Sequence, residues 1–351
     1  MRPLTDLFGA SQFSTGFVVG IVALLVTLPT ALGLSALFPK RARRPGLAGP
    51  AFAIGTVVAL GGGAGTDLIQ SVPTDVVLGL VLLWLAGAIA GRTDAPGLVG
   101  IVAALPGGIV LASANAGLSA GWVPVVVAGG AALIGATTAD FDRRTARFGL
   151  GPLLFFGAVF GTYITVPDTE LMRAAVGVAL PLVALAWPYA AASLGAGGAY
   201  AAVGMLVWIM PIDGIGRAGA IVGSIGAFAL LVGEPVGRRI GRELESRVRL
   251  HRIPIRKPIV TVLAAQVVLM LYATRVAGRV QTASAALLLL IPGLVASVAF
   301  GVFLVLPEKR RHQSKTRRSK RDSSSRTGSG RTSSGRGERR LHGEGSHDDY
   351  V

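Results

Sequence analysis

The stretch FVVGIVALLVTLPTALGLSALF, residues 17–38, carries no charged side chain and is followed at once by PKRARR, residues 39–44. A helix that crosses the hydrocarbon layer of a membrane, about 30 Å thick, needs roughly 20 apolar residues. Residues 17–38 are therefore long enough to span a bilayer. Short loops rich in lysine and arginine stay on the cytoplasmic side, so the two segments predict a first membrane helix that begins outside the cell and ends in the cytoplasm.

The rest of the 351-residue chain has the same character. Hydrophobic residues make up 52% of it and charged residues 15%, and the mean hydropathy is +0.62. The apolar residues come in long runs, such as residues 76–91, 174–194 and 283–306. Apolar runs of this length indicate membrane helices. The sequence therefore predicts an all-α, polytopic integral membrane protein.

Breaks at glycine, proline and charged residues divide these runs into eleven predicted spans, and ten or twelve also fit because some runs are short or rich in glycine. The spans are residues 17–38, 51–69, 76–92, 97–113, 122–139, 150–166, 172–194, 197–211, 218–233, 259–276 and 283–306. They form a predicted transmembrane domain of residues 1–306, which leaves residues 307–351 as a tail.

Basic residues are concentrated in alternate loops, which predicts the orientation of the chain. With residues 40–44 in the cytoplasm, Arg92, residues 140–147, residues 238–257 and the tail all fall on the cytoplasmic side. The prediction is an N-terminus outside and a C-terminus inside. A cleaved signal peptide is the alternative for this first helix, but a retained membrane helix fits better because the apolar run is long and its basic block follows it.

The cell type and an internal repeat rest on weaker patterns. Arginine outnumbers lysine, and alanine and glycine are abundant. This composition is typical of GC-rich bacterial genes, so we expect the plasma (inner) membrane of a bacterium. The loops after spans one, five and nine are the most basic, which suggests a repeated four-helix unit, but helices of similar length would also give this spacing.

The cytoplasmic segment of residues 234–258 is predicted to form an amphipathic helix, because Val236, Ile240, Leu244 and Val248 recur every fourth residue. We expect it to lie in the membrane interface, with a solvated extension of span nine as the alternative. Its arginines would contact anionic lipid headgroups. These predicted lipid contacts are Arg238, Arg239, Arg242, Arg247 and Arg249.

The tail of residues 307–351 is rich in arginine, serine and glycine and has almost no apolar residues. Such a segment cannot bury enough surface to offset the entropy of ordering, so disorder is expected. In the cytoplasm it would be attracted to anionic lipid by about 1 kcal/mol per basic residue near the surface, and it could bind envelope proteins. Nucleic-acid binding is not expected, because Tyr350 is the one Phe, Tyr or Trp residue in the tail that could stack on bases.

A run of glycines breaks the second predicted span. Unwound backbone in a membrane is tolerated where it is buried in protein or lines a cavity, and transporters bind substrates or ions at such breaks. Close helix packing through small residues is the alternative explanation. The candidate pathway residues are Gly61, Gly62, Gly63, Gly65, Thr66 and Asp67.

Three predicted outer loops combine proline with an acidic residue, at Asp75, Asp168 and Asp213. Proline cannot continue a helix, and an Asp or Thr side chain can cap the next helix by accepting a free backbone N–H. Capping is the interpretation we prefer. A set of carboxylates around an outer vestibule that attracts cations is the alternative.

The sequence excludes several classes of catalytic and metal site. It has no cysteine, and its four histidines, His251, His312, His342 and His347, lie in the predicted cytoplasmic segment or the tail. Thiolate chemistry is therefore excluded, no P-loop is present, and we expect neither a metal nor a cofactor. The first hypothesis is a permease-like transporter of a small solute or a lipid-linked molecule. The alternatives are a non-catalytic scaffold for envelope or division proteins and a membrane transferase acting on a lipid-linked substrate.

Overall fold

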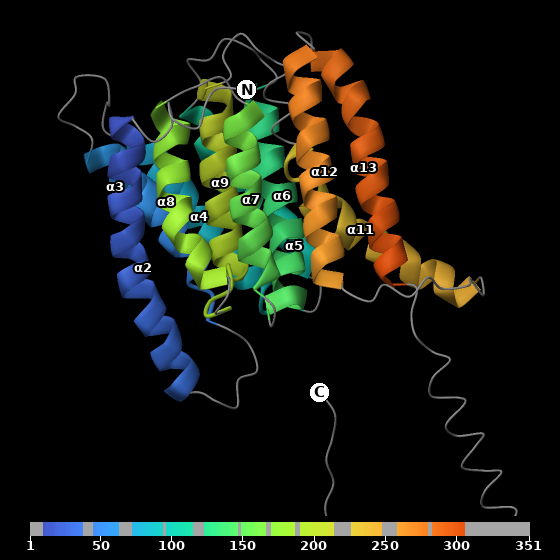
Figure 1. The fold of residues 1–351 in the computed structure, drawn as a ribbon, viewed down its shortest axis with the longest axis horizontal. Coiled ribbons are helices and arrows are strands. Elements are labelled where there is room, and N and C mark those ends of the chain that lie inside the picture. The colour runs from blue at the N-terminus through green and yellow to red at the C-terminus, as the bar shows by residue number, and fades with distance from the viewer. Residues whose placement is uncertain are drawn as a thin grey trace, which may run out of the picture. The chain divides into compact units, whose positions relative to one another are not determined.

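The computed structural model describes residues 10–37, 45–62, 72–93, 96–114, 123–146, 149–165, 170–186, 190–213, 226–247, 258–279 and 283–305. Within these ranges the regular secondary structure consists of eleven α-helices and no strand (Figure 1). The prediction of an all-helical chain is confirmed. The predicted tail, residues 307–351, lies outside the described residues.

The helices follow the predicted apolar runs closely. They are α2 (Ser11–Leu37), α3 (Ala48–Gly62), α4 (Thr74–Ala90), α5 (Pro96–Ser113), α6 (Val123–Thr145), α7 (Leu150–Thr165), α8 (Glu170–Ala186), α9 (Ala196–Asp213), α11 (Ala229–Arg247), α12 (Pro258–Arg279) and α13 (Ala283–Val305). Two predicted spans have larger gaps than the others, because residues 218–225 of the ninth span and residues 63–69 of the second lie outside the described ranges.

One of the described helices is both long and apolar enough to cross a membrane. This helix, α2, has 27 residues, and an 18-residue window within it has a mean hydropathy of 2.4. Shorter apolar helices of 10–17 residues occur within α3, α4, α5, α7, α9, α12 and α13. Length and composition thus mark a single candidate span near the N-terminus, and the eleven-span membrane topology stays a prediction.

Helix α9 lies at the centre of the packing. Every residue from 197 to 211 is buried, and α9 contacts α3, α4, α5, α6 and α8. Outside it, α2 packs along α8, and α5 lies between α4 and α6. Helices α11, α12 and α13 contact one another and join the rest of the chain through α6 and α7. An apolar helix without a polar face belongs in such an interior position.

Many of the glycines bring helix backbones close together. A Cβ atom added to Gly16 of α2 would collide with the carbonyl oxygen of Ala174 in α8. In the same way, Gly49 of α3 lies on Gly198 of α9, and Gly301 of α13 lies on the backbone of Glu234. Small residues that permit this approach are typical of helix packing in membranes.

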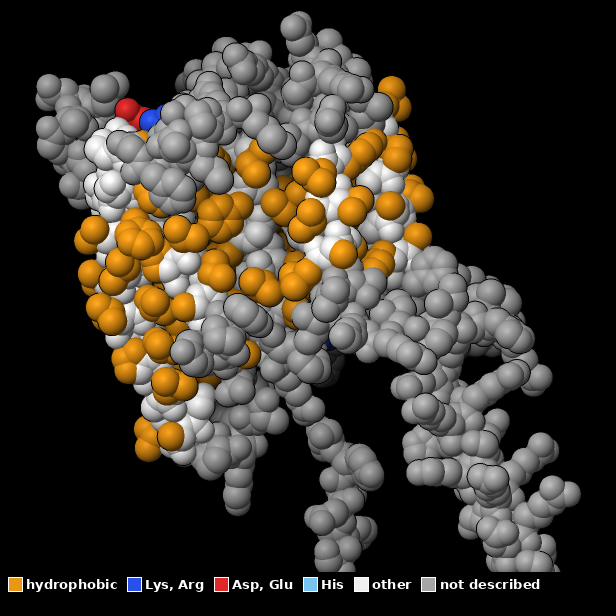
Figure 2. Space-filling model, viewed as in Figure 1, with side chains coloured by type: hydrophobic (Ala, Val, Ile, Leu, Met, Phe, Trp, Pro, Cys, Tyr) orange, Lys and Arg blue, Asp and Glu red, His pale blue; other side chains and the backbone are white. Residues whose placement is uncertain are grey.

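Large apolar side chains also cover much of the outer surface. Figure 2 shows them over the described helices on one face of the molecule. Leu25 of α2 is 67% exposed, Val268 of α12 is 63% exposed and Leu288 of α13 is 67% exposed. Further exposed leucine, isoleucine and valine side chains lie on α4, α5 and α6. Extensive apolar surface of this kind indicates a membrane or protein partner.

Candidate functional site

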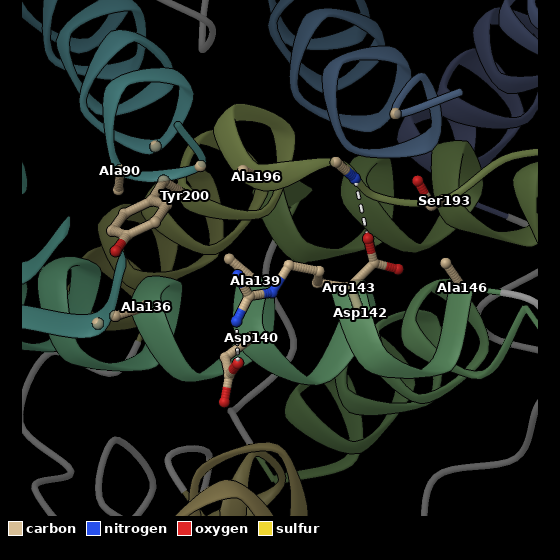
Figure 3. Close-up of a pocket in the computed structure, with 15 residues that line it drawn as sticks. Ala90, Ala136, Ala139, Asp140, Asp142, Arg143, Ala146, Ser193, Ala196 and Tyr200 are labelled. Atoms are coloured by element: carbon tan, nitrogen blue, oxygen red, sulfur yellow. Dashed lines mark hydrogen bonds and ion pairs between the residues drawn. The ribbon is translucent and has the colours of Figure 1, made fainter. Parts of the chain in front are cut away.

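A cavity of about 170 Å³ lies where the ends of α4, α5, α6 and α9 meet (Figure 3). Its wall is mostly glycine and alanine, with a few polar groups. The lining residues are Gly46, Gly87, Ala90, Gly91, Gly97, Ala136, Ala139, Asp140, Asp142, Arg143, Ala146, Ser193, Gly195, Ala196 and Tyr200. Most of them come from segments between helices or from the helix turns beside those segments.

One wall is formed by residues 190–195, which are not helical although their side chains are largely buried. The backbone N–H of Ser193 donates to the carbonyl oxygen of Pro45 at 2.9 Å, and its carbonyl oxygen accepts from the N–H of Ala48 at 3.0 Å. These bonds hold the segment against the start of α3. The predicted span of residues 172–194 is therefore wrong in its last part, because α8 ends at Ala186, two residues before a proline that cannot continue the helix.

The carboxylate of Asp142 is the most unusual group at this cavity. Its side chain is 2% exposed. Oδ2 accepts a hydrogen bond from the backbone N–H of Gly195 at 3.0 Å, drawn as a dashed line in Figure 3, whereas the buried Oδ1 has no hydrogen-bond partner. A Cβ atom on Gly151 would collide with Oδ1. Glycine at that position therefore lets the first turn of α7 lie directly against the carboxylate.

Burial raises the pKa of the Asp142 carboxyl from 3.8 to about 6, and hydrogen bonds from the backbone N–H groups of Leu194 and Gly195 oppose this rise. Asp142 lies beyond residue 139, the end of the predicted span. A carboxyl group with a pKa of about 6 changes its charge near physiological pH, which few side chains do.

Tyr200 of α9 forms the opposite side of the cavity. Glycines of three neighbouring helices, Gly87, Gly100 and Gly135, make room for it, since a Cβ atom on any of them would meet its ring or hydroxyl group. Its buried hydroxyl has no hydrogen-bond partner. Arg143 is 43% exposed and forms an ion pair with Asp140 at 3.1 Å. The cavity thus has a polar rim and three buried polar residues, Asp142, Ser193 and Tyr200.

A second polar cluster joins α6 to α11. Glu234 is 1% exposed and forms ion pairs with Arg144 of α6, at 3.1 Å, and with Arg238 of its own helix. Arg144 also pairs with Asp140 at 3.2 Å. The ion pairs therefore connect the rim of the cavity with the α11–α13 group. The sequence shows Asp142 and Glu234 only as acidic residues within basic segments, so nothing in it marks them as buried.

The predicted pathway at the glycine run is only partly described. Gly61 is exposed, and a Cβ atom there would meet nothing within 4 Å, so this glycine is not explained by close packing. Gly62 is the last residue of α3. Gly63, Gly65, Thr66 and Asp67 lie outside the described residues. The glycine-run pathway therefore stays a prediction.

The three acidic residues of the predicted outer loops have different outcomes. Asp75 is exposed in the first turn of α4, where its charge is favourable near the positive end of the helix. It does not cap the helix, because the N-cap residue is Pro73 and makes no side-chain hydrogen bond. Asp213 is the last residue of α9, and Asp168 lies outside the described residues. The vestibule they would form stays a prediction.

The amphipathic segment is part of a longer helix. Helix α11 runs without a break from Ala229 to Arg247, so within the described residues the segment continues the ninth predicted span instead of forming a separate surface helix. Gly233 and Gly237 pack against α13. The apolar stripe of the segment, which begins with Val236 and Ile240, therefore faces outward. Val236 is 41% exposed and Ile240 is 42% exposed.

The predicted lipid-contact arginines are described to different extents. Arg238 pairs with Glu234, and Arg239 is exposed. Arg242 and Arg247 lie on α11, and Arg249 lies outside the described residues. Of the predicted contacts, Arg239 is thus the one whose exposed side chain the structure describes.

Comparison with known proteins adds no family to these observations. No family model and no curated protein matches the sequence. The geometry of the site therefore carries the functional argument alone.

Proposed function

We propose that the protein is a polytopic membrane protein of about eleven spans, with its N-terminus outside and its C-terminus in the cytoplasm of a bacterial cell. The apolar side chains exposed over α2, α4, α5, α12 and α13 support this proposal, because water would disfavour so large an apolar surface. Glycine-mediated contacts between helices support it as well.

The position of the cavity supports the proposed orientation. It is lined by Gly46, Gly91, Asp142 and Gly195, which lie in the first four segments that the proposed topology puts in the cytoplasm; the first three of these segments are basic and the fourth follows from the count of spans. Arg144 and Glu234 connect the fifth such segment to the same region. These segments are far apart in the sequence but meet around one cavity, which is expected if all of them lie on the cytoplasmic side.

Within that membrane protein, the cavity is the cytoplasmic end of a pathway for a small solute. The observation that carries this proposal is the buried carboxylate of Asp142 beside the nonhelical segment of residues 190–195. Transporters bind substrates and ions at interrupted helices, where backbone groups and a few polar side chains face a cavity. Ionisable groups buried in such proteins mark ion or proton pathways.

The exposed face of α11 fits a contact with anionic lipid. Val236 and Ile240 would enter the apolar layer while Arg239 stays at the headgroup level. Basic residues near the membrane surface attract anionic headgroups. The predicted partners at this face are therefore lipids, and the tail of residues 307–351 would add to the same attraction.

Filling the cavity tests the transport proposal. Ala139→Leu adds three carbon atoms at the cavity wall and is expected to lower solute movement severalfold. Gly129→Leu is the matched control, because a Cβ atom on this exposed residue of α6 meets nothing within 4 Å. The solute is first identified by comparing the metabolites of cells with and without the gene. The variants are then compared at equal membrane abundance.

The transport proposal fails if deletion changes no solute pool. It also fails if Ala139→Leu and Gly129→Leu restore the deletion strain equally well. Equal restoration would mean that the cavity is packing space and that no solute passes through it.

A further inference from the structure

None of the ion pairs among the described residues includes Asp142. Two described arginines lie at the cavity wall, Arg143 as a lining residue and Arg239 of α11 against Gly97. On its own helix, Asp140 pairs with Arg143 and Arg144 at 3.1 and 3.2 Å. Tyr200 is the ionisable residue that α9 contributes to the cavity wall. The first turn of α7 and residues 190–196 contain no ionisable side chain, and the cavity-lining residues of α4 and α5 are glycine and alanine. The carboxylate is therefore stabilised mainly by backbone N–H groups.

A proton is the cation that best fits this arrangement. Divalent metals need several oxygen or nitrogen ligands, and the described residues hold no cluster of three or more His, Cys, Asp or Glu side chains. A proton needs only one lone pair. When it binds, an O–H bond forms at Oδ1, and the charge of the buried carboxylate is removed without any other ligand.

Protonation would also weaken the hydrogen bond between Asp142 and the nonhelical segment of residues 190–195. The ionised carboxylate accepts from the N–H of Gly195 at 3.0 Å, and hydrogen bonds to a charged acceptor are about twice as strong as neutral ones. Gly195 has a φ of 76° and directly precedes α9. A weaker bond at this residue loosens the junction between the segment and α9, beside the cavity.

We propose that Asp142 is the proton-binding site that couples proton movement to solute movement through the cavity, an inference that rests on the proposed transport function. The proton enters from cytoplasmic water, binds Oδ1 of the carboxylate and releases the backbone at Gly195. For coupled movement, the O–H bond then breaks as the segment closes again, and the proton leaves Oδ1 with the solute toward the outer side. The remaining steps of transport use the same cavity.

The opening step can be measured without a known solute, because the chain contains no cysteine and a single introduced thiol is unique. Ala196→Cys places a thiol on the cavity wall next to Gly195, and Ser113→Cys places one on the exposed end of α5 as the reference. The ratio of their labelling rates in the purified full-length protein removes most of the pH dependence of the thiol reaction itself.

The labelling ratio is expected to rise on the order of tenfold between pH 8 and pH 5, which is the equilibrium effect of weakening one charge-assisted hydrogen bond. With Asp142→Asn, which resembles the protonated carboxyl, the ratio should be high at both pH values. A ratio that does not change with pH overturns the proposal. An Asp142→Asn protein whose labelling ratio depends on pH as in the natural sequence also overturns it.

Coupling is then tested in vesicles of phosphatidylethanolamine and phosphatidylglycerol containing the protein and an entrapped pH-sensitive dye. The solute found in the gene-deletion comparison should move protons with it, and Asp142→Asn should move solute without protons. Movement driven by a sodium gradient and indifferent to pH would overturn the coupling while leaving the transport function intact. If no solute crosses but the labelling ratio still responds to pH through Asp142, the transport function fails and the proton site stands.

Discussion

Replacing both Arg144 and Arg238 with alanine is expected to lower the free energy of unfolding by about 3–5 kcal/mol. Glu234, which is 1% exposed, would then lose both of its ion-pair partners among the described residues. A lone buried charge costs several kcal/mol, because water no longer solvates it. The measurement is chemical unfolding of the purified protein in detergent.

Two further variants separate this effect from the loss of arginine itself. Arg143→Ala removes a neighbouring arginine whose pair with Asp140 is partly exposed, and should cost less than about 1 kcal/mol. Adding Glu234→Gln to the double variant removes the stranded charge and should restore more than half of the lost stability. A double variant as stable as the natural protein would mean that Glu234 reaches solvent.

Asp142→Asn is expected to make the protein more stable at neutral pH, by an amount that disappears in acid. The pKa of Asp142 rises from 3.8 to about 6 on folding, so the folded state holds the proton more tightly. The resulting stabilisation is complete below about pH 4 and is lost as the pH rises through about 6. At pH 7.5 the charged carboxylate therefore costs about 3 kcal/mol, which the asparagine avoids.

Unfolding measurements at pH 4.5, 6 and 7.5 check this prediction. The difference between Asp142→Asn and the natural protein should grow with pH. Asp142→Ala is the comparison variant, because it also leaves the buried N–H of Gly195 without an acceptor, at a cost of about 1–3 kcal/mol. It should be less stable than Asp142→Asn at every pH. A stability difference that is constant between pH 4.5 and 7.5 would mean that Asp142 is not the titrating group.

The helices could be predicted from the sequence because each apolar run is a local feature. Residues 150–166 and 97–113, for example, match α7 and α5 closely. The end of α8 was predicted less well. Residues 172–194 read as one apolar run, but Pro188 and the contacts of Ser193 with Pro45 and Ala48 end the helix at Ala186.

The polar groups of the site could not be predicted, because their burial depends on distant segments. Asp142 lies among charged residues in the sequence, yet Gly151 and Gly195 enclose it in the fold. Glu234 is buried because α13 packs against α11 through Gly301. The apolar stripe on α11 was recognisable from its spacing. The side it faces depends on Gly233 and Gly237, whose role the spacing does not show.

Single-cysteine labelling of intact cells tests the membrane topology, on which both functional proposals depend. Ser113→Cys lies at the end of α5 that the proposed topology puts outside the cell, and Thr93→Cys lies in the turn after α4 on the cytoplasmic side, near the cavity. With a membrane-impermeant thiol reagent, Cys at position 113 should label in intact cells. Cys at position 93 should label only after the membrane is permeabilised. Equal labelling of both positions in intact cells, or the reverse pattern, would contradict a membrane bundle with its cavity open to the cytoplasm.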